Sequence, residues 1–311
     1  AGNKERNYTW LISAMHGFTE RYWEKSRKIK IFKQYTIYNK MKKLWLFALL
    51  GAFIIAVGMF VVAKPEFVSA ENPAGNTFKI PSHAVQISEG VFSLGTARDA
   101  DGRIVEGLMF IHNKKENAKP GSGRGSGSGS STCYAYLASG AKWKTVESYL
   151  VDPSNTAGLN EQFIIDNLAS DIAKWESASG ANILGNKVTG TVDRANIGNL
   201  NDQNEVIFAN IDGSETIAVT TIWGIFSGPT RNRVLVEWDQ VYDSGFSWSS
   251  SGESGKMDFE NIATHELGHA VGMGHPTGTC TEETMYAYAD YGETKKRSLN
   301  AGDIAGISKL Y

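Results

Sequence analysis

Hydrophobic and polar positions divide the chain into stretches with different patterns. Residues 44–63 are an unbroken run of apolar or glycine residues, which at about 1.5 Å per helical residue can cross a bilayer core of about 30 Å. Lys42 and Lys43 precede this run, so the positive-inside rule places the basic tail 1–43 in the cytoplasm and the rest of the chain outside. The run predicts a transmembrane anchor. A signal segment that is cleaved to release a secreted protein is the alternative.

Shorter apolar runs follow the membrane segment. Residues 84–87, 91–94 and 104–111 are apolar stretches separated by glycine and aspartate turns, as in strands and hairpins. They predict that residues 71–115 form a small β-rich module or a propeptide. Residues 116–132 are dominated by glycine and serine, which is typical of a flexible linker, and we place a domain boundary there.

Residues 133–311 alternate between helical and strand periodicity. Apolar residues recur at helical spacing over 160–176, and a second helix can begin after Asp258, whose side chain is a good N-cap. Stretches rich in Val, Ile, Thr and Trp predict strands at 146–151, 205–211, 217–225 and 233–239. This order of elements predicts an α+β domain.

The most specific chemistry of the sequence lies in the second of these helices. His265 and His269 are four residues apart, so on a helix both imidazoles project toward one ion. Glu266 follows the first of them, where its carboxylate can act as general base on a water at the open position of a catalytic zinc. Gly272 allows a tight reversal of the chain, after which His275 completes a site of three neutral imidazoles.

The pattern from His265 to His275 resembles the metzincin signature of zinc endopeptidases. Met285 stands where metzincins have the methionine turn, an apolar floor beneath the zinc ligands. Tyr286 directly after it resembles the matrixins, as does the closing segment 299–311.

The resemblance implies a fold and a reaction. The fold is a zincin-like metzincin domain over residues 133–311, with a twisted mixed β-sheet, an active-site helix and a C-terminal helix. The reaction is hydrolysis of peptide bonds in extended protein substrates outside the cytoplasm, by a zinc-bound water that Glu266 activates.

Some positions depart from the matrixin pattern. Where matrixins usually have Pro and Tyr shortly after the methionine, this chain has Ala287 and Ala289, so the family's substrate preference does not carry over. The only histidines after His112 are the three of the motif, and we predict no second zinc. The family's calcium loop resembles residues 237–243 loosely, which leaves Ca²⁺ binding open. The resemblance also suggests that residues 217–225 form the edge strand of the cleft, to which a peptide adds.

Two other functions fit parts of the sequence. The histidines could hold a structural zinc in a non-catalytic, membrane-anchored surface-binding protein whose function lies in residues 71–115. A structural site normally has four protein ligands, and only three are present here beside a retained Glu266, which favours catalysis. Nucleic-acid binding by the basic residues 1–43 is disfavoured, because a membrane segment follows them and the exported part is acidic.

The composition indicates the size of the folded part and is consistent with an exported protein. The chain has 311 residues, 41% of them hydrophobic, and a net charge of −2, which suits one or two domains plus attachments. In an exported protein the two cysteines, Cys133 and Cys280, indicate one disulfide. In matrixin propeptides a cysteine can bind the zinc instead, but Cys133 lacks the Pro-Arg-Cys-Gly pattern of those propeptides.

Overall fold

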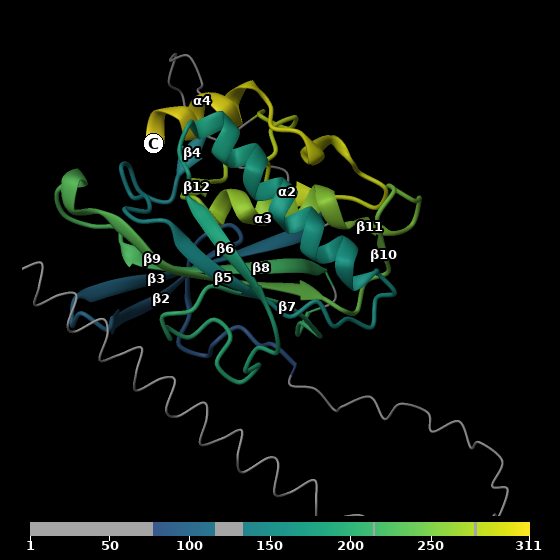
Figure 1. The fold of residues 1–311 in the computed structure, drawn as a ribbon, viewed down its shortest axis with the longest axis horizontal. Helices are drawn as coiled ribbons and strands as arrows, with labels where there is room; N and C mark the ends of the chain where they lie inside the picture. Colours follow the sequence, from purple (N-terminus) through teal and green to yellow (C-terminus); the bar gives the residue numbers. More distant parts are fainter. Residues whose placement is uncertain (1–76, 116–132, 214, 277–278) are drawn as a thin grey trace, which may run out of the picture. The chain divides into compact units, whose positions relative to one another are not determined.

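The computed structural model describes residues 77–115, 133–213, 215–276 and 279–311 (Figure 1). These belong to one compact unit, Ala70–Tyr311. The predicted tail, membrane segment and linker lie outside the described residues. No helix within the described ranges is long and apolar enough to cross a membrane.

The described part of the chain is built on one mixed β-sheet (Figure 1). Its strands in spatial order are β1 (Val85–Ser88), β2 (Val91–Arg98), β3 (Ile104–Lys114), β8 (Thr216–Ile225), β9 (Val234–Asp243), β7 (Glu205–Ala209), β5 (Glu147–Val151) and β6 (Leu184–Thr189), and β13 (Tyr288–Ala289) also pairs with β3. The strands from β9 to β6 run parallel to one another. β8 runs antiparallel to β9, and β3 runs antiparallel to β8.

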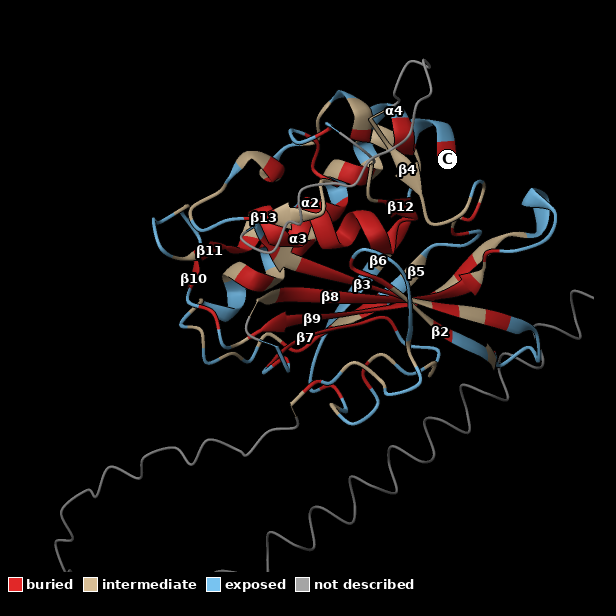
Figure 2. Ribbon diagram, turned by 180° about the vertical axis from the view of Figure 1, so that it is seen from behind, coloured by how far each residue is buried: buried red, intermediate tan, exposed pale blue. Residues whose placement is uncertain are grey.

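The helices α2 (Glu161–Ser179), α3 (Phe259–Ala270) and α4 (Ala301–Leu310) lie over one face of this sheet (Figures 1 and 2). Asn160 caps α2 by accepting the N–H of Phe163, and Asp258 caps α3 by accepting the N–H of Asn261. Gly180 ends α2 in the left-handed conformation. The remaining short elements are β4 (Ala135–Tyr136), β10 (Trp248–Ser249), β11 (Met257–Asp258), β12 (Met273–Gly274), η2 (Thr230–Asn232) and η3 (Lys295–Arg297).

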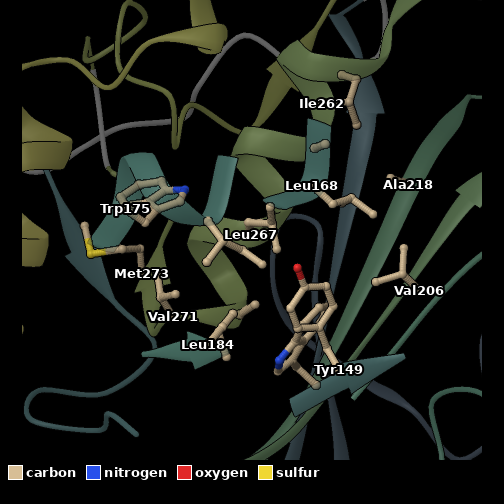
Figure 3. Close-up of a cluster of buried hydrophobic side chains, with 14 of the residues drawn as sticks. Tyr149, Leu168, Trp175, Leu184, Val206, Ala218, Ile262, Leu267, Val271 and Met273 are labelled. Carbon is tan, nitrogen blue, oxygen red and sulfur yellow. The ribbon is translucent and has the colours of Figure 1, made fainter. Parts of the chain in front are cut away.

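Side chains on the two faces of the sheet form two cores. The larger core lies between the sheet and the helices and includes Leu168, Trp175 and Leu267 (Figure 3). The second core includes Val105 of β3 and Trp223 of β8. Because both faces of the sheet are covered here, β7 and β8 are buried along nearly their whole length.

The expectation that residues 71–115 form a separate module is wrong for the residues that the structure describes. β1, β2 and β3 continue the same sheet, and β3 pairs with β8 from Glu106 opposite Gly224 to Asn113 opposite Thr216. β8 is therefore not an edge strand, contrary to the expectation for residues 217–225. The physical reason is that β3 has buried side chains on both faces, which a small hairpin alone cannot cover.

The other predicted elements are found close to their expected positions. The helix expected at 160–176 is α2, and the four expected strands are β5, β7, β8 and β9. β6 was not predicted, because its residues are mostly polar and exposed.

Candidate active site

Helix α3 carries His265, Glu266 and His269 into the interior of the molecule, where all three side chains are buried. Trp175 of α2 fixes the helix from behind by donating from Nε1 to the carbonyl oxygen of Thr264 at 2.9 Å. The motif therefore stands on a packed element, which holds its side chains in one geometry.

The structure brings the three histidines of the motif together. Nε2 of His275 lies 3.1 Å from Nε2 of His269 and 3.2 Å from Nε2 of His265. His275 reaches the others because the chain turns at Gly272, whose φ is 103° and where an added Cβ would lie 2.9 Å from a backbone oxygen. Donors of a tetrahedral zinc with bonds of about 2.0 Å are about 3.3 Å apart, so the three nitrogens fit one such ion.

The second nitrogen of two of these rings has a backbone partner. Nδ1 of His265 lies 2.7 Å from the carbonyl oxygen of Thr284, and Nδ1 of His269 lies 2.9 Å from that of Met273. A carbonyl only accepts, so each Nδ1 carries the proton and each Nε2 lone pair points to the centre. Burial lowers the pKa of His269 to about 4, which keeps the ring neutral, as a metal ligand must be.

Met285 is fully buried against the helix that carries the motif. It packs so closely on α3 that a Cβ added to Gly268 would lie 2.2 Å from its sulfur. The backbone N–H groups of Thr284 and Met285 donate to the carboxylate of Asp303 in α4, at 2.7 and 3.2 Å. Since Thr284 also holds His265, the C-terminal helix positions a candidate ligand, a role that the sequence did not reveal.

The carboxylate of Glu266 lies beside the histidines, with a side-chain partner on each oxygen. Oε2 accepts from the hydroxyl of Thr220 on β8 at 2.6 Å, and Oε1 shares a hydrogen bond of 2.8 Å with Nδ1 of His112. Burial raises the pKa of Glu266 to about 8, against the lowering effects of Thr220 and Lys296. A cation held by the three imidazoles would also act to lower the pKa of Glu266.

His112 of β3 is the residue that sequence reasoning missed, since no other candidate ligand lies near it in the sequence. It is buried, and its ring centroid lies 4.0 Å from that of His265. Its Nε2 lies 3.1 Å from Nζ of Lys296, which is itself fully buried. A charged Lys296 only donates, so Nε2 then accepts and Nδ1–H donates to Glu266. The only local signal was a polar ring at the end of an apolar strand.

The two cysteines form a disulfide with their Cα atoms 5.5 Å apart. Neither thiol is therefore free to bind a metal. The bond joins the start of the described region 133–213 to the loop that precedes Met285. The two cysteines are separated by 147 positions in the sequence.

The carboxylates of residues 237–243, which loosely resemble the calcium loop of the family, lie on β9 and accept backbone hydrogen bonds. Asp239 accepts the N–H groups of Gly198 at 2.7 Å and Glu205 at 3.1 Å, and Glu237 accepts another from the same loop at 2.8 Å. Among the described residues, the groups of histidine and acidic side chains close enough to share a metal both lie at α3. The structure thus gives these carboxylates a role in fixing a loop and does not support a calcium site there.

Comparisons with known proteins agree with the geometry of the histidine site. The family model described as Matrixin matches residues 145–311. Matrilysin of Rattus norvegicus is 38% identical over 73 residues, which are 24% of this chain and 26% of the relative. The hatching enzyme of Paracentrotus lividus is 26% identical over 156 residues, which are 50% of this chain and 24% of the relative. The chain thus spans about a quarter of the length of these relatives.

Among solved structures, metalloproteinase-II from Bacteroides fragilis aligns over 72% of this chain and 80% of its own, with 10% identity and a TM-score of 0.29. A score this low carries no argument about the fold.

Proposed function

The chain belongs to the matrixin family, and on that premise we propose that it is a zinc-dependent endopeptidase acting on extended protein substrates outside the cytoplasm. One arrangement carries the proposal. Three imidazole nitrogens converge on one point, and the buried carboxylate of Glu266 lies beside them without belonging to this set. In this proposal His265, His269 and His275 are the zinc ligands, and Glu266 is the general base.

When bound, zinc supplies a Lewis acid that polarises the scissile carbonyl and acidifies the attacking water. The residues of the chain move the proton. Glu266 accepts it from the water and returns it to the nitrogen of the leaving amine. Thr220 orients the carboxylate by donating to Oε2, so Oε1 is the oxygen that takes the proton. The carbonyls of Thr284 and Met273 keep two imidazoles in the ligating tautomer.

The number of ligands supports catalysis over a structural metal site. Structural zinc sites normally have four protein ligands, whereas three imidazoles converge here. The nearest carboxylate, that of Glu266, has Thr220 and His112 as partners. An open fourth position is what hydrolysis requires, and a non-catalytic surface-binding protein would have no use for it.

Export belongs to the same proposal. Residues 44–63 would anchor the chain or be cleaved to release it, leaving the metal site outside the cytoplasm. The disulfide between Cys133 and Cys280 supports this, since such bonds persist in oxidising compartments.

Zinc content and proteolysis, measured on the same samples, test the proposal. The full chain, purified in mild detergent and loaded with zinc, is incubated with casein beside Glu266→Gln, which keeps the size of the side chain. We expect about one zinc in both proteins, because Glu266 is not a ligand, and hydrolysis only by the chain that retains it. Bound zinc without hydrolysis by both the unaltered chain and the β3 variants Gly107→Val and His112→Ala would reject the endopeptidase and favour the surface-binding alternative.

A further inference from the structure

Strand β3 lies where an extended peptide would bind in this site. On one side it pairs antiparallel with β8 along most of its length. On the other side β2 pairs with it antiparallel from Ile104 to Phe110, and β13 pairs with it in parallel at Asn113 and Lys114. Figure 2 shows β3 next to β8 and below α3. Extended peptides bind proteins by adding to a sheet in this manner. β3 therefore takes the main-chain positions that a substrate needs.

The side chains of β3 alternate between the second core and the candidate metal site. Met109 and Ile111 belong to the second core, which anchors the strand. Phe110 faces the other way and stacks on His269 with ring centroids 4.2 Å apart, with its edge toward His275 at 5.7 Å. The neighbouring His112 covers the third ligand ring, so aromatic rings of β3 lie against all three candidate ligands.

His112 also engages the general base. Its hydrogen bond to Oε1 of Glu266 occupies the oxygen that must receive the proton of the attacking water, while Thr220 occupies the other. Lys296 fixes the far side of the ring, and its Nζ also donates to the carbonyl oxygen of Tyr288 in β13 at 2.5 Å. In this arrangement each oxygen of Glu266 already accepts a hydrogen bond from a protein side chain.

We propose that β3 is an internal occupant of the substrate cleft that keeps the enzyme latent, and that a peptide is cut only after it replaces β3 between β8 and β13. The inference rests on the proposed function, because a strand can inhibit only a cleft that would otherwise turn over. His112 acts in it as a positioning residue that holds Glu266 idle. The same contacts let a free peptide with the sequence of residues 104–114 bind in the vacated cleft.

Gly107 offers a way to displace β3 without altering the catalytic residues. An added Cβ there would lie 2.8 Å from the ring of Trp223 and 2.9 Å from Cβ of Leu94, so Gly107→Val forces the strand from its partners. Ile104→Phe is the matched control, since it adds bulk to an exposed side chain of the same strand. With the full chain, we expect casein hydrolysis to rise at least about tenfold in Gly107→Val and to stay unchanged in Ile104→Phe.

Hydrogen exchange of the β8 amides gives a readout that needs neither zinc nor turnover. We expect Thr216–Ile225 to exchange faster in Gly107→Val than in the control, because one of the two neighbours of β8 has left. Should Gly107→Val fail to fold, His112→Ala decides the question. It removes the contacts that tie β3 to Glu266 and Lys296 without adding bulk to the strand. A peptide then replaces β3 more readily, so hydrolysis should again rise at least about tenfold.

A synthetic peptide of residues 104–114 completes the test. It should inhibit the activated Gly107→Val chain, and the same peptide carrying His112→Ala should inhibit at least about tenfold more weakly. Equal hydrolysis by the unaltered chain, Gly107→Val and His112→Ala would overturn the inference. Faster exchange in β8 with no hydrolysis by any variant would instead reject the proposed peptidase, so the two failures are distinguishable.

Discussion

Two glutamates, Glu266 on α3 and Glu237 on β9, are alike in their burial but differ in their hydrogen-bond partners. Both are fully buried, and burial raises their pKa values, to about 8 and about 7. Glu237 accepts backbone N–H groups of a loop, whereas the partners of Glu266 are two side chains, Thr220 of β8 and His112 of β3. Burial and a shifted pKa therefore do not identify a catalytic carboxylate. A catalytic carboxylate is better identified by side-chain hydrogen-bond partners together with metal-ligand atoms that converge beside it.

The largest effect that separates the two sites is expected from Glu266→Gln. In the Gly107→Val background, casein hydrolysis should fall at least about a thousandfold, because Gln cannot accept the proton. The unfolding free energy should change by no more than about 1 kcal/mol, since no backbone group depends on this side chain. Hydrolysis rates and urea unfolding measure the two. Turnover that survives would mean that another group is the base.

Asp239→Ala should show the reverse behaviour, a loss of stability without an effect on the metal site. Asp239 and Glu237 form a cluster of carboxylates that accept loop N–H groups. It leaves the buried N–H groups of Gly198 and Glu205 without their acceptor, which should lower the unfolding free energy by about 3 kcal/mol. Zinc content should not change. Asp101→Ala, at an exposed carboxylate, is the control for urea unfolding. A variant that lost zinc while keeping its stability would place this cluster in the metal site.

Removal of zinc should destabilise one site only. A ligand that binds the folded state at 100 times its Kd adds about 2.7 kcal/mol to stability, so a chelator should lower the melting temperature of the unaltered chain. His269→Ala should melt at the same temperature with and without zinc, whereas Glu237→Gln should keep the full response. Thermal unfolding with a matched zinc titration measures this. A zinc response retained by His269→Ala would contradict the assigned ligand.

The smallest effect is expected from the titration of Glu237. Its pKa is raised by burial from 4.5 to about 7, so the folded state keeps a proton that the unfolded state releases between these values. The resulting stabilisation is full below pH 4.5 and is lost as the pH rises through 7. Relative to Glu237→Gln, the unaltered chain should therefore lose about 2 kcal/mol between pH 5 and 8 in urea unfolding. A constant difference would show that the loop N–H groups keep Glu237 ionised throughout.

The positions of the candidate ligands could be predicted from sequence because their geometry is local. His265 and His269 share one turn of a helix, and Gly272 permits the reversal that brings His275 back. The position of His112 could not be predicted in this way. It meets Glu266 through the register of β3 on β8, which joins parts of the chain far apart in sequence and leaves no local pattern.

The expected domain boundary failed for a related reason. The glycine and serine content of residues 116–132 says that the segment is a connection, but composition does not say whether the strands before and after it share a sheet. The strands with strong apolar patterns were predicted, whereas the polar, exposed β6 was not. Local pattern predicts elements, and the pairing of distant elements decides what they enclose.

Because β3 belongs to the same chain as the cleft that it fills, its binding is set by an effective concentration, on the order of millimolar for a short linker, and dilution does not weaken it. A break of the backbone anywhere between Lys114 and Cys133 would change this. The strand and the cleft would become two molecules, and their association would then depend on how much of each is present. A single cut between these two residues would thus turn a permanent contact into one that dissociates on dilution.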